Sequence, residues 1–224
     1  MKRALIISAH PDDDILGCGA IINKYKSEVE FKVVFIGEGS TCRFEDPESS
    51  EAQEEIKKRN NFAIEAFSVL GISNHSFNNL PCGRFDQVPL IEINKIIERE
   101  IKSFEPDTIF THSKNDSNQD HVKVFRSTII AARPGSGVKT IYSYEVLSST
   151  EWGFDRAFNA NIFFRISKND LDKKIEAFAK YATETKPFPY PRSSEGILVL
   201  AKRRGMQSNS QYAEAFNLIR QTIE

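Results

Sequence analysis

The chain has 224 residues, of which 40% are apolar and 27% are charged, and its formal net charge is -1. This composition is typical of a folded globular protein, and the balanced charge excludes a general binder of nucleic acid or of anionic membranes. No apolar run reaches the roughly 18 residues of a membrane span. The three cysteines are widely spaced and lack a Cys-x-x-Cys pair, which predicts neither a disulfide framework nor a thiolate zinc site and favours a reducing cytoplasm.

Short apolar runs alternate with helical patterns through the first half of the chain. Strands are predicted at residues 4–9, 31–36, 75–80 and 108–112. Helices are predicted at residues 15–26, 50–70, 90–104 and 121–132. Ser50 and Gln53 predict a capping box at the start of the second helix. This alternation is typical of βαβ units and predicts a Rossmann-like α/β fold with three layers and a mostly parallel sheet.

The second half of the chain is predicted to be a mixed α/β part of the same domain. Strands are expected at residues 140–147 and 161–166, and helices at residues 171–181, 194–204 and 212–223. Three prolines in the segment 186–191 exclude a regular helix or a central strand there and predict a rigid loop. Because no repeat or linker interrupts the sequence, residues 1–224 are predicted to form one domain.

The densest polar cluster, His-Pro-Asp-Asp-Asp at residues 10–14, directly follows the first predicted strand. Three adjacent carboxylates repel one another unless a cation or hydrogen bonds compensate them. His10 and Asp13 could turn toward one point and bind a divalent metal. The alternative is a polar turn in which an aspartate caps the next helix.

A second polar cluster, residues 112–121, follows the fourth strand and contains two of the four histidines, His112 and His121. Because the carboxyl ends of parallel strands lie at one edge of a sheet, we expect the two clusters to meet. His10, Asp13 and His121 would then form a two-histidine, one-carboxylate set, which is the ligand pattern of catalytic zinc. The alternative for His121 is an exposed polar residue at a helix start.

These motifs carry a family resemblance. His-Pro-Asp-Asp at 10–13, Leu-Gly at 16–17 and Asp-His at 120–121 resemble the LmbE-like (PIG-L) family of zinc-dependent N-deacetylases, in a bacterial branch. The resemblance covers most of the chain. It implies one zinc ion per chain, or another divalent metal, held by His10, Asp13 and His121. It also implies that Asp12 is the general base.

The resemblance extends to several other residues. Arg59 matches an arginine that contacts substrate, and Arg192 could meet a phosphate or carboxylate of the substrate, although a structural role is the alternative. Asn118 stands where relatives often have histidine, so it could donate a neutral hydrogen bond to an oxyanion but could not deliver a proton. His112 is expected either beside the substrate or as a support behind the metal site. Cys82 replaces a family aspartate and is expected to be a small apolar filler.

The function implied is a metal-dependent amidohydrolase that removes an acetyl group from an N-acetylated amino sugar or its conjugate. In this interpretation zinc-bound water attacks the amide carbonyl after Asp12 takes its proton. Two alternatives stay open, namely a metal-dependent phosphoesterase and a non-catalytic sugar-binding metalloprotein. We expect a cytoplasmic enzyme with a small-molecule sugar or glycoconjugate as partner and without nucleic-acid or integral membrane contact. A homo-oligomer is left open.

Overall fold

The computed structural model describes residues 1–223, and within them one seven-stranded sheet forms the middle layer. The strand order is β3-β2-β1-β4-β5-β7-β6. The strands are β1 (Arg3–Ser8), β2 (Glu30–Gly37), β3 (Asn74–Leu80), β4 (Thr108–His112), β5 (Thr140–Tyr144), β6 (Ile162–Arg165) and β7 (Ala213–Gln221). β1 to β5 are parallel, whereas β7 runs antiparallel to both of its neighbours. The predicted fold class, a Rossmann-like three-layer fold with a mixed C-terminal part, is confirmed.

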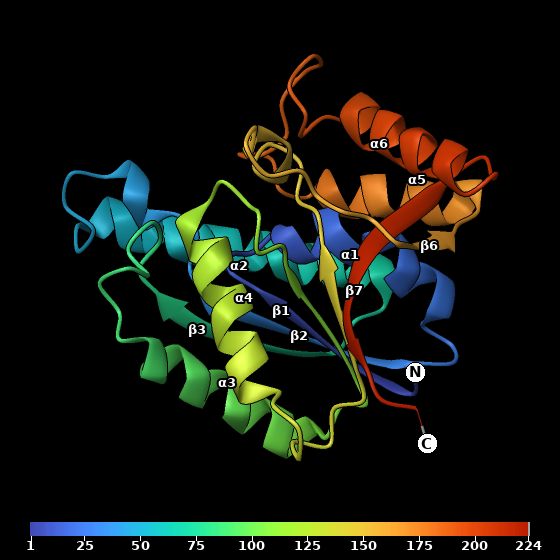
Figure 1. Ribbon diagram of the computed structural model, residues 1–224. Coiled ribbons are helices and arrows are strands. Elements are labelled where there is room, and N and C mark those ends of the chain that lie inside the picture. Colours follow the sequence, from blue (N-terminus) through green and yellow to red (C-terminus); the bar gives the residue numbers. More distant parts are fainter. Residues whose placement is uncertain (224) are drawn as a thin grey trace.

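Helices cover both faces of the sheet (Figure 1). They are α1 (Asp13–Tyr25), α2 (Ser50–Leu70), α3 (Leu90–Phe104), α4 (Gln119–Ala131), α5 (Lys168–Phe178) and α6 (Ser194–Gln207), with the short 3-10 helices η1 (Thr41–Arg43) and η2 (Thr150–Trp152). α1, α2 and α5 pack together on one face, α3 and α4 pack on the other, and α6 lies against β7. In residues 1–223 we find no helix with the length and apolarity that crossing a membrane requires.

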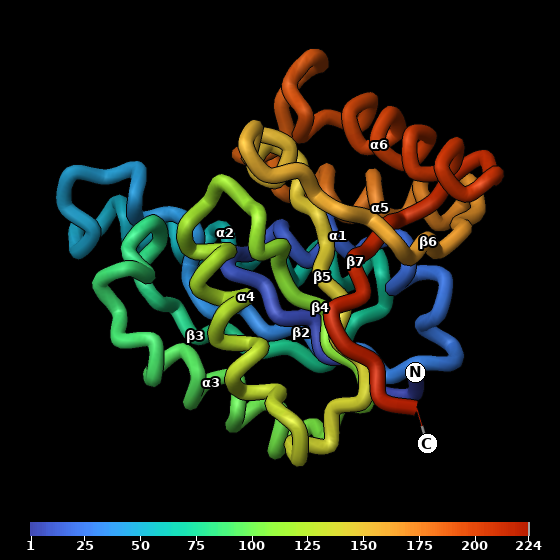
Figure 2. Tube along the Cα trace, viewed as in Figure 1, coloured from blue at the N-terminus to red at the C-terminus, as the bar shows by residue number. Residues whose placement is uncertain are grey.

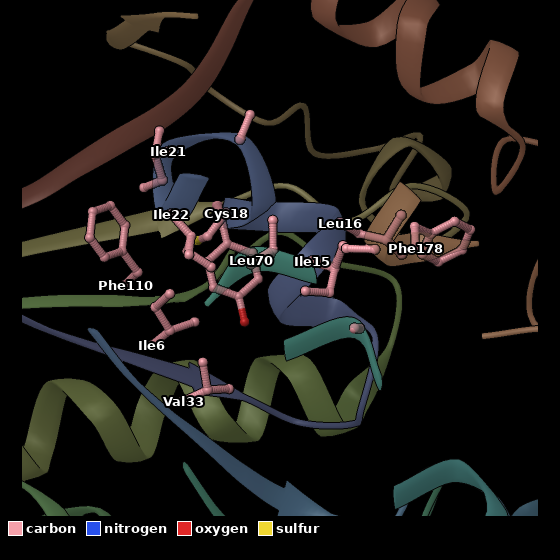
Figure 3. Close-up of a cluster of buried hydrophobic side chains, with 14 of the residues drawn as sticks. Ile6, Ile15, Leu16, Cys18, Ile21, Ile22, Val33, Leu70, Phe110 and Phe178 are labelled. Carbon is pink, nitrogen blue, oxygen red and sulfur yellow. The ribbon is translucent and has the colours of Figure 1, made fainter. Parts of the chain in front are cut away.

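The apolar core has two parts, one on each side of the sheet. Along β1, Ala4 and Ile6 join the cluster under α1, whereas Leu5 and Ile7 join the cluster under α3 and α4. All four are fully buried, which explains why the strand reads as an unbroken apolar run. Figure 3 shows the first cluster, in which side chains of α1 pack against strand residues such as Ile6 and Phe110.

Two local predictions are wrong. Residues 212–223 were predicted to be helical, but Ala213–Gln221 form β7, which Figure 2 shows running beside β5. Phe216 lies opposite Tyr144 of β5 and Ile162 of β6, and burial between two strands outweighs the local helical spacing of the segment. The predicted capping box is also wrong, because the cap of α2 is Ser49, whose side chain accepts a hydrogen bond from Ala52 N, and Ala52 has no side-chain acceptor that could complete a box.

Between β1 and β4 lies the point where the chain switches from building one side of the sheet to building the other. From β1 the chain builds outward to β2 and β3 on one side, and then returns to place β4 and β5 on the other. In open α/β sheets the crevice beyond the carboxyl ends of such strands is the usual ligand site. The loops that follow Ser8 and His112 both emerge there, as the sequence predicted.

Candidate metal centre

The turn between β1 and α1 sends two neighbouring aspartates in different directions. Asp12 is the N-cap residue of α1 by position, with a φ of 118°, but its side chain makes no capping hydrogen bond. A non-glycine residue with this φ is strained, and such strain gathers at functional sites. Asp13 turns toward the histidines, where Asp13 Oδ2 lies 3.3 Å from His121 Nε2, while Asp12 turns toward two arginines.

The structure brings together the three predicted ligands. One ligand atom each from His10, Asp13 and His121 lies within 4.8 Å of the other two, and all three residues are buried. His10 follows β1, Asp13 begins α1, and His121 lies in the first turn of α4. Their placement agrees with the predicted metal site, while metal binding itself stays a prediction.

Each histidine is oriented by a carboxylate behind it. His10 Nε2 lies 2.9 Å from Asp120 Oδ2, and His121 Nδ1 lies 3.2 Å from Asp116 Oδ2. The other ring nitrogens, His10 Nδ1 and His121 Nε2, face Asp13 Oδ2 at 3.6 and 3.3 Å. A carboxylate that accepts one imidazole N–H fixes the ring and leaves the lone pair of the second nitrogen for a metal.

The donor set fits a cation. Among the residues that the structure describes, the buried atoms Asp13 Oδ1 and His121 Nε2 have no hydrogen-bond partner, although buried polar atoms are normally paired. Burial opposes ionisation of Asp13, but His121 and the other site histidines outweigh it and hold the pKa of Asp13 well below its usual value. Burial also lowers the pKa of His121, yet Asp13 and Asp116 outweigh it and raise that pKa to about 10. A cation of some kind, proton or metal, is therefore favoured between these groups.

Asp12 belongs to a second buried cluster with Arg59, Arg192 and Glu184. Its Oδ2 accepts from Arg59 Nη2 at 2.9 Å and from Arg192 Nη1 at 2.8 Å. Arg59 Nη1 also donates to Glu184 Oε1 at 2.7 Å. Burial raises the pKa of Asp12 to about 6, against the opposing effect of the two arginines. Asp12 Oδ1 is buried and, within residues 1–223, unpaired.

The sequence profile of the PIG-L family, described as GlcNAc-PI de-N-acetylase, matches residues 5–132, more than half of the chain. The protein belongs to the PIG-L family. A search of curated protein sequences found no significant match.

Solved structures similar to this PIG-L protein include N,N'-diacetylchitobiose deacetylase from Pyrococcus horikoshii, with a TM-score of 0.78, 20% identity, and coverage of 98% of this chain and 84% of that one. The zinc-inhibited form of teicoplanin deacetylase Orf2 has a TM-score of 0.77 and 15% identity over all of both chains. GalB, the 4-carboxy-2-hydroxymuconate hydratase from Pseudomonas putida, has a TM-score of 0.74 and 21% identity over 100% of this chain and 98% of that one. At these identities the likeness shows the fold alone, which a hydratase shares with deacetylases.

The arginines predicted to contact substrate have protein partners in this PIG-L fold. Arg59 is 3% exposed and donates to the Pro11 carbonyl as well as to Asp12. Arg192, on the loop before α6, donates from Nε to the Leu147 carbonyl and from Nη1 to Asp12. Both side chains therefore hold the Asp12 turn in place, and their contact with substrate stays a prediction.

Asn118 and His112 also have structural partners. Asn118 caps α4, where its Oδ1 accepts from Asp120 N at 2.9 Å. His112 is fully buried, its Nε2 accepts from Ala9 N at 2.8 Å, and its ring stacks on His121 with centroids 4.0 Å apart. This position behind His121 agrees with the supporting role more than with substrate contact, which remains untested, as does the predicted oxyanion contact of Asn118.

Sequence reasoning assigned no role to three carboxylates of the site. Asp116 and Asp120 orient His121 and His10, and both lie in the polar loop that the sequence singled out, so the spacing before His121 could have indicated them. Glu184 binds Arg59 and Arg192 from the far C-terminal part of the chain. Its local sequence gives no signal, because only the tertiary fold places it beside the arginines.

Proposed function

We propose that the protein is a metal-dependent N-deacetylase that removes an acetyl group from an N-acetylated amino sugar or its conjugate. Membership in the PIG-L family supports this activity. The observation that carries the proposal is the convergence of His10, Asp13 and His121, with the unpaired Nε2 of His121 directed at Asp13. Such a site suits zinc or another divalent metal.

His10, Asp13 and His121 would hold the metal. When bound there, a divalent cation lowers the pKa of a water ligand toward 7 and polarises the amide carbonyl. Asp116 and Asp120 keep the two imidazoles in the tautomers that direct Nε2 of His121 and Nδ1 of His10 toward the centre. Burial of the whole set limits competing water around the reacting groups.

Asp12 would be the general base. Its Oδ1 has no partner within the described residues and is available to take a proton from the attacking water, while Oδ2 is fixed by Arg59 and Arg192. Burial raises the pKa of Asp12 to about 6, and the two guanidinium groups act against this effect. Part of the Asp12 population therefore stays ionised. A pKa near the working pH suits a group that first accepts a proton and then returns it to the leaving amine.

A cleft that shares Asp116 with the metal centre, but is lined by none of His10, Asp13 and His121, is the candidate place for the sugar. It has a volume of about 430 Å³, and its lining includes Asp116, Arg126 and Trp152. Trp152 is 42% exposed and contacts Tyr190 edge to face. An exposed indole face beside polar side chains is suited to the apolar face and hydroxyl groups of a sugar ring. A cytoplasmic location remains a prediction from cysteine usage alone.

The test is a panel of N-acetylated amino sugars, free and nucleotide-linked, in which released acetate and released phosphate are both measured. We expect acetate release that stops when the metal is chelated and in Asp12→Asn. Phosphate release without acetate would support the phosphoesterase instead. Sugar binding without any turnover, unchanged in Asp12→Asn, would support the non-catalytic sugar-binding protein.

A further inference from the structure

Two cysteines from different loops touch each other beside the metal centre. Cys82 Sγ lies 3.3 Å from Cys42 Sγ. Cys42 belongs to η1 after β2 and is exposed, whereas Cys82 follows β3 and is buried. Cys82 was expected to be a small apolar filler, but it contacts a second thiol, that of Cys42, which is 40 residues away in the chain.

The backbone already holds the two cysteine loops together. Glu38, at the end of β2, accepts from Cys82 N through Oε1 at 2.6 Å and from Thr41 N through Oε2 at 3.0 Å. A disulfide requires sulfurs about 2.05 Å apart, so closure needs an approach of only about 1.2 Å from the observed contact. The pair is therefore close to bonding geometry in a part of the fold that Glu38 fixes.

Both loops also contact the surroundings of His10. Gly83 N, next to Cys82, donates at 2.6 Å to Asp120 Oδ2, the same oxygen that lies 2.9 Å from His10 Nε2. On the other side, Gly39 has a φ of 77°, and a Cβ built on it would lie 2.9 Å from the Cβ of His10. Drawing the two loops together would therefore shift the carboxylate that orients His10.

We propose that Cys42 and Cys82 form a reversible disulfide that displaces the partner of His10 and weakens metal binding. The oxidant is a low-molecular-weight disulfide such as oxidised glutathione. The Cys42 thiolate attacks one sulfur of that disulfide and releases the other half as a thiolate. The Cys82 thiol then attacks Cys42 Sγ and passes its proton to the second half, which leaves as a thiol. Two protein thiols are thus oxidised while one small disulfide is reduced to two thiols.

Accessibility and charge fit Cys42 as the thiol that reacts first. Cys42 is the exposed member of the pair, so the oxidant reaches it first. The hydrogen bond from Cys82 lowers the pKa of Cys42 to about 6, which favours its thiolate. Cys18 is buried in α1 and belongs to the apolar core, so it offers a matched control.

The experiment treats the purified full-length protein with oxidised glutathione and measures intact mass and disulfide-linked peptides. We expect the wild type and Cys18→Ala to lose the mass of two hydrogens, in a bond that maps to Cys42 and Cys82 and that a phosphine reductant reverses. Cys42→Ser should show no such loss. No disulfide in the wild type, or a glutathione adduct on Cys42 that never resolves, would overturn the proposal.

Coupling to the metal centre is measured separately by zinc competition with a chromogenic chelator. Loss of an outer partner of a metal-bound histidine typically lowers metal affinity about 10- to 100-fold, and we expect a fall of at least about tenfold in the oxidised wild type. Oxidant-treated Cys42→Ser should keep its affinity. Equal zinc affinity in the oxidised and reduced wild type would overturn the coupling. The zinc readout rests on the proposed metal site, but neither readout depends on a substrate, so absence of deacetylase activity would leave both tests intact.

Discussion

Asp12 and Asp13 are neighbours in the chain, but their side chains enter two different buried clusters. Asp13 faces His10 and His121, where its Oδ1 has no hydrogen-bond partner among the described residues. Asp12 faces Arg59 and Arg192, which together donate two charge-assisted hydrogen bonds to its Oδ2. The first cluster takes its positive charge from a proton on His121, whose pKa is raised to about 10, or from a metal in its place, whereas the second takes its positive charge from two arginines.

The protonation of the two aspartates follows this difference. The pKa of Asp13 is held well below its usual value because three histidines outweigh its burial. Burial raises the pKa of Asp12 to about 6, although both arginines act against it. Two identical side chains thereby differ in protonation, which suits the proposed roles of Asp13 as a ligand that stays ionised and of Asp12 as a group that exchanges a proton.

The largest effect expected in the arginine-bound cluster is that of Asp12→Asn. The amide cannot take a proton from water, so turnover should fall about 10²- to 10⁴-fold, while the zinc content stays at the wild-type level. Steady-state acetate release and metal analysis of the same preparation check both parts. Near-normal turnover would show that another group is the base.

Asp116→Asn tests the carboxylate that contacts His121 Nδ1. The amide still contacts His121 Nδ1 but carries no charge, so zinc affinity should fall about 10- to 100-fold. Asp172→Asn is the control, because that carboxylate is exposed on α5 and pairs with Lys168. Equal affinities in the two variants would remove Asp116 from the site.

Arg192→Gln distinguishes a residue that holds Asp12 from one that contacts substrate. Removing this cation raises the pKa of Asp12, since an adjacent positive charge lowers a carboxyl pKa by about 1–3. A base works only when it is unprotonated, so the acidic limb of the rate profile should move to higher pH by about one unit. A raised KM with an unmoved acidic limb would instead support the substrate contact predicted from the sequence.

Asn118→Ala should have the smallest effect. Losing the cap of α4 should cost about 1 kcal/mol of unfolding free energy, similar to Ser167→Ala at the cap of α5. A drop in turnover in Asn118→Ala alone, with zinc retained, would support its predicted contact with the oxyanion. Denaturant unfolding and acetate release measure the two quantities, and equal turnover in both variants would limit Asn118 to its capping role.

The parts of this comparison that the sequence could predict are local. The apolar runs of β1 and β4 and the polar residues that follow each of them indicate one shared sheet edge, and hence the meeting of His10 with His121. Contacts between residues far apart in the chain leave no comparable pattern in the sequence. The β7 segment was predicted as a helix from its local spacing, but its pairing with β5 and β6 decides its conformation. Glu184 binds the arginines of the Asp12 cluster, and this could not be predicted because only the tertiary fold brings it near them.

Zinc binding by matched histidine variants tests the central claim most directly. The wild type, His121→Ala and His75→Ala are loaded with zinc and titrated against a competing chelator. His75 is the control because it lies in β3, packed against Phe67 and Phe77. We predict one tightly bound zinc per chain in the wild type and in His75→Ala, and loss of most of it in His121→Ala. Equal zinc affinity in His121→Ala and the wild type would contradict the metal centre.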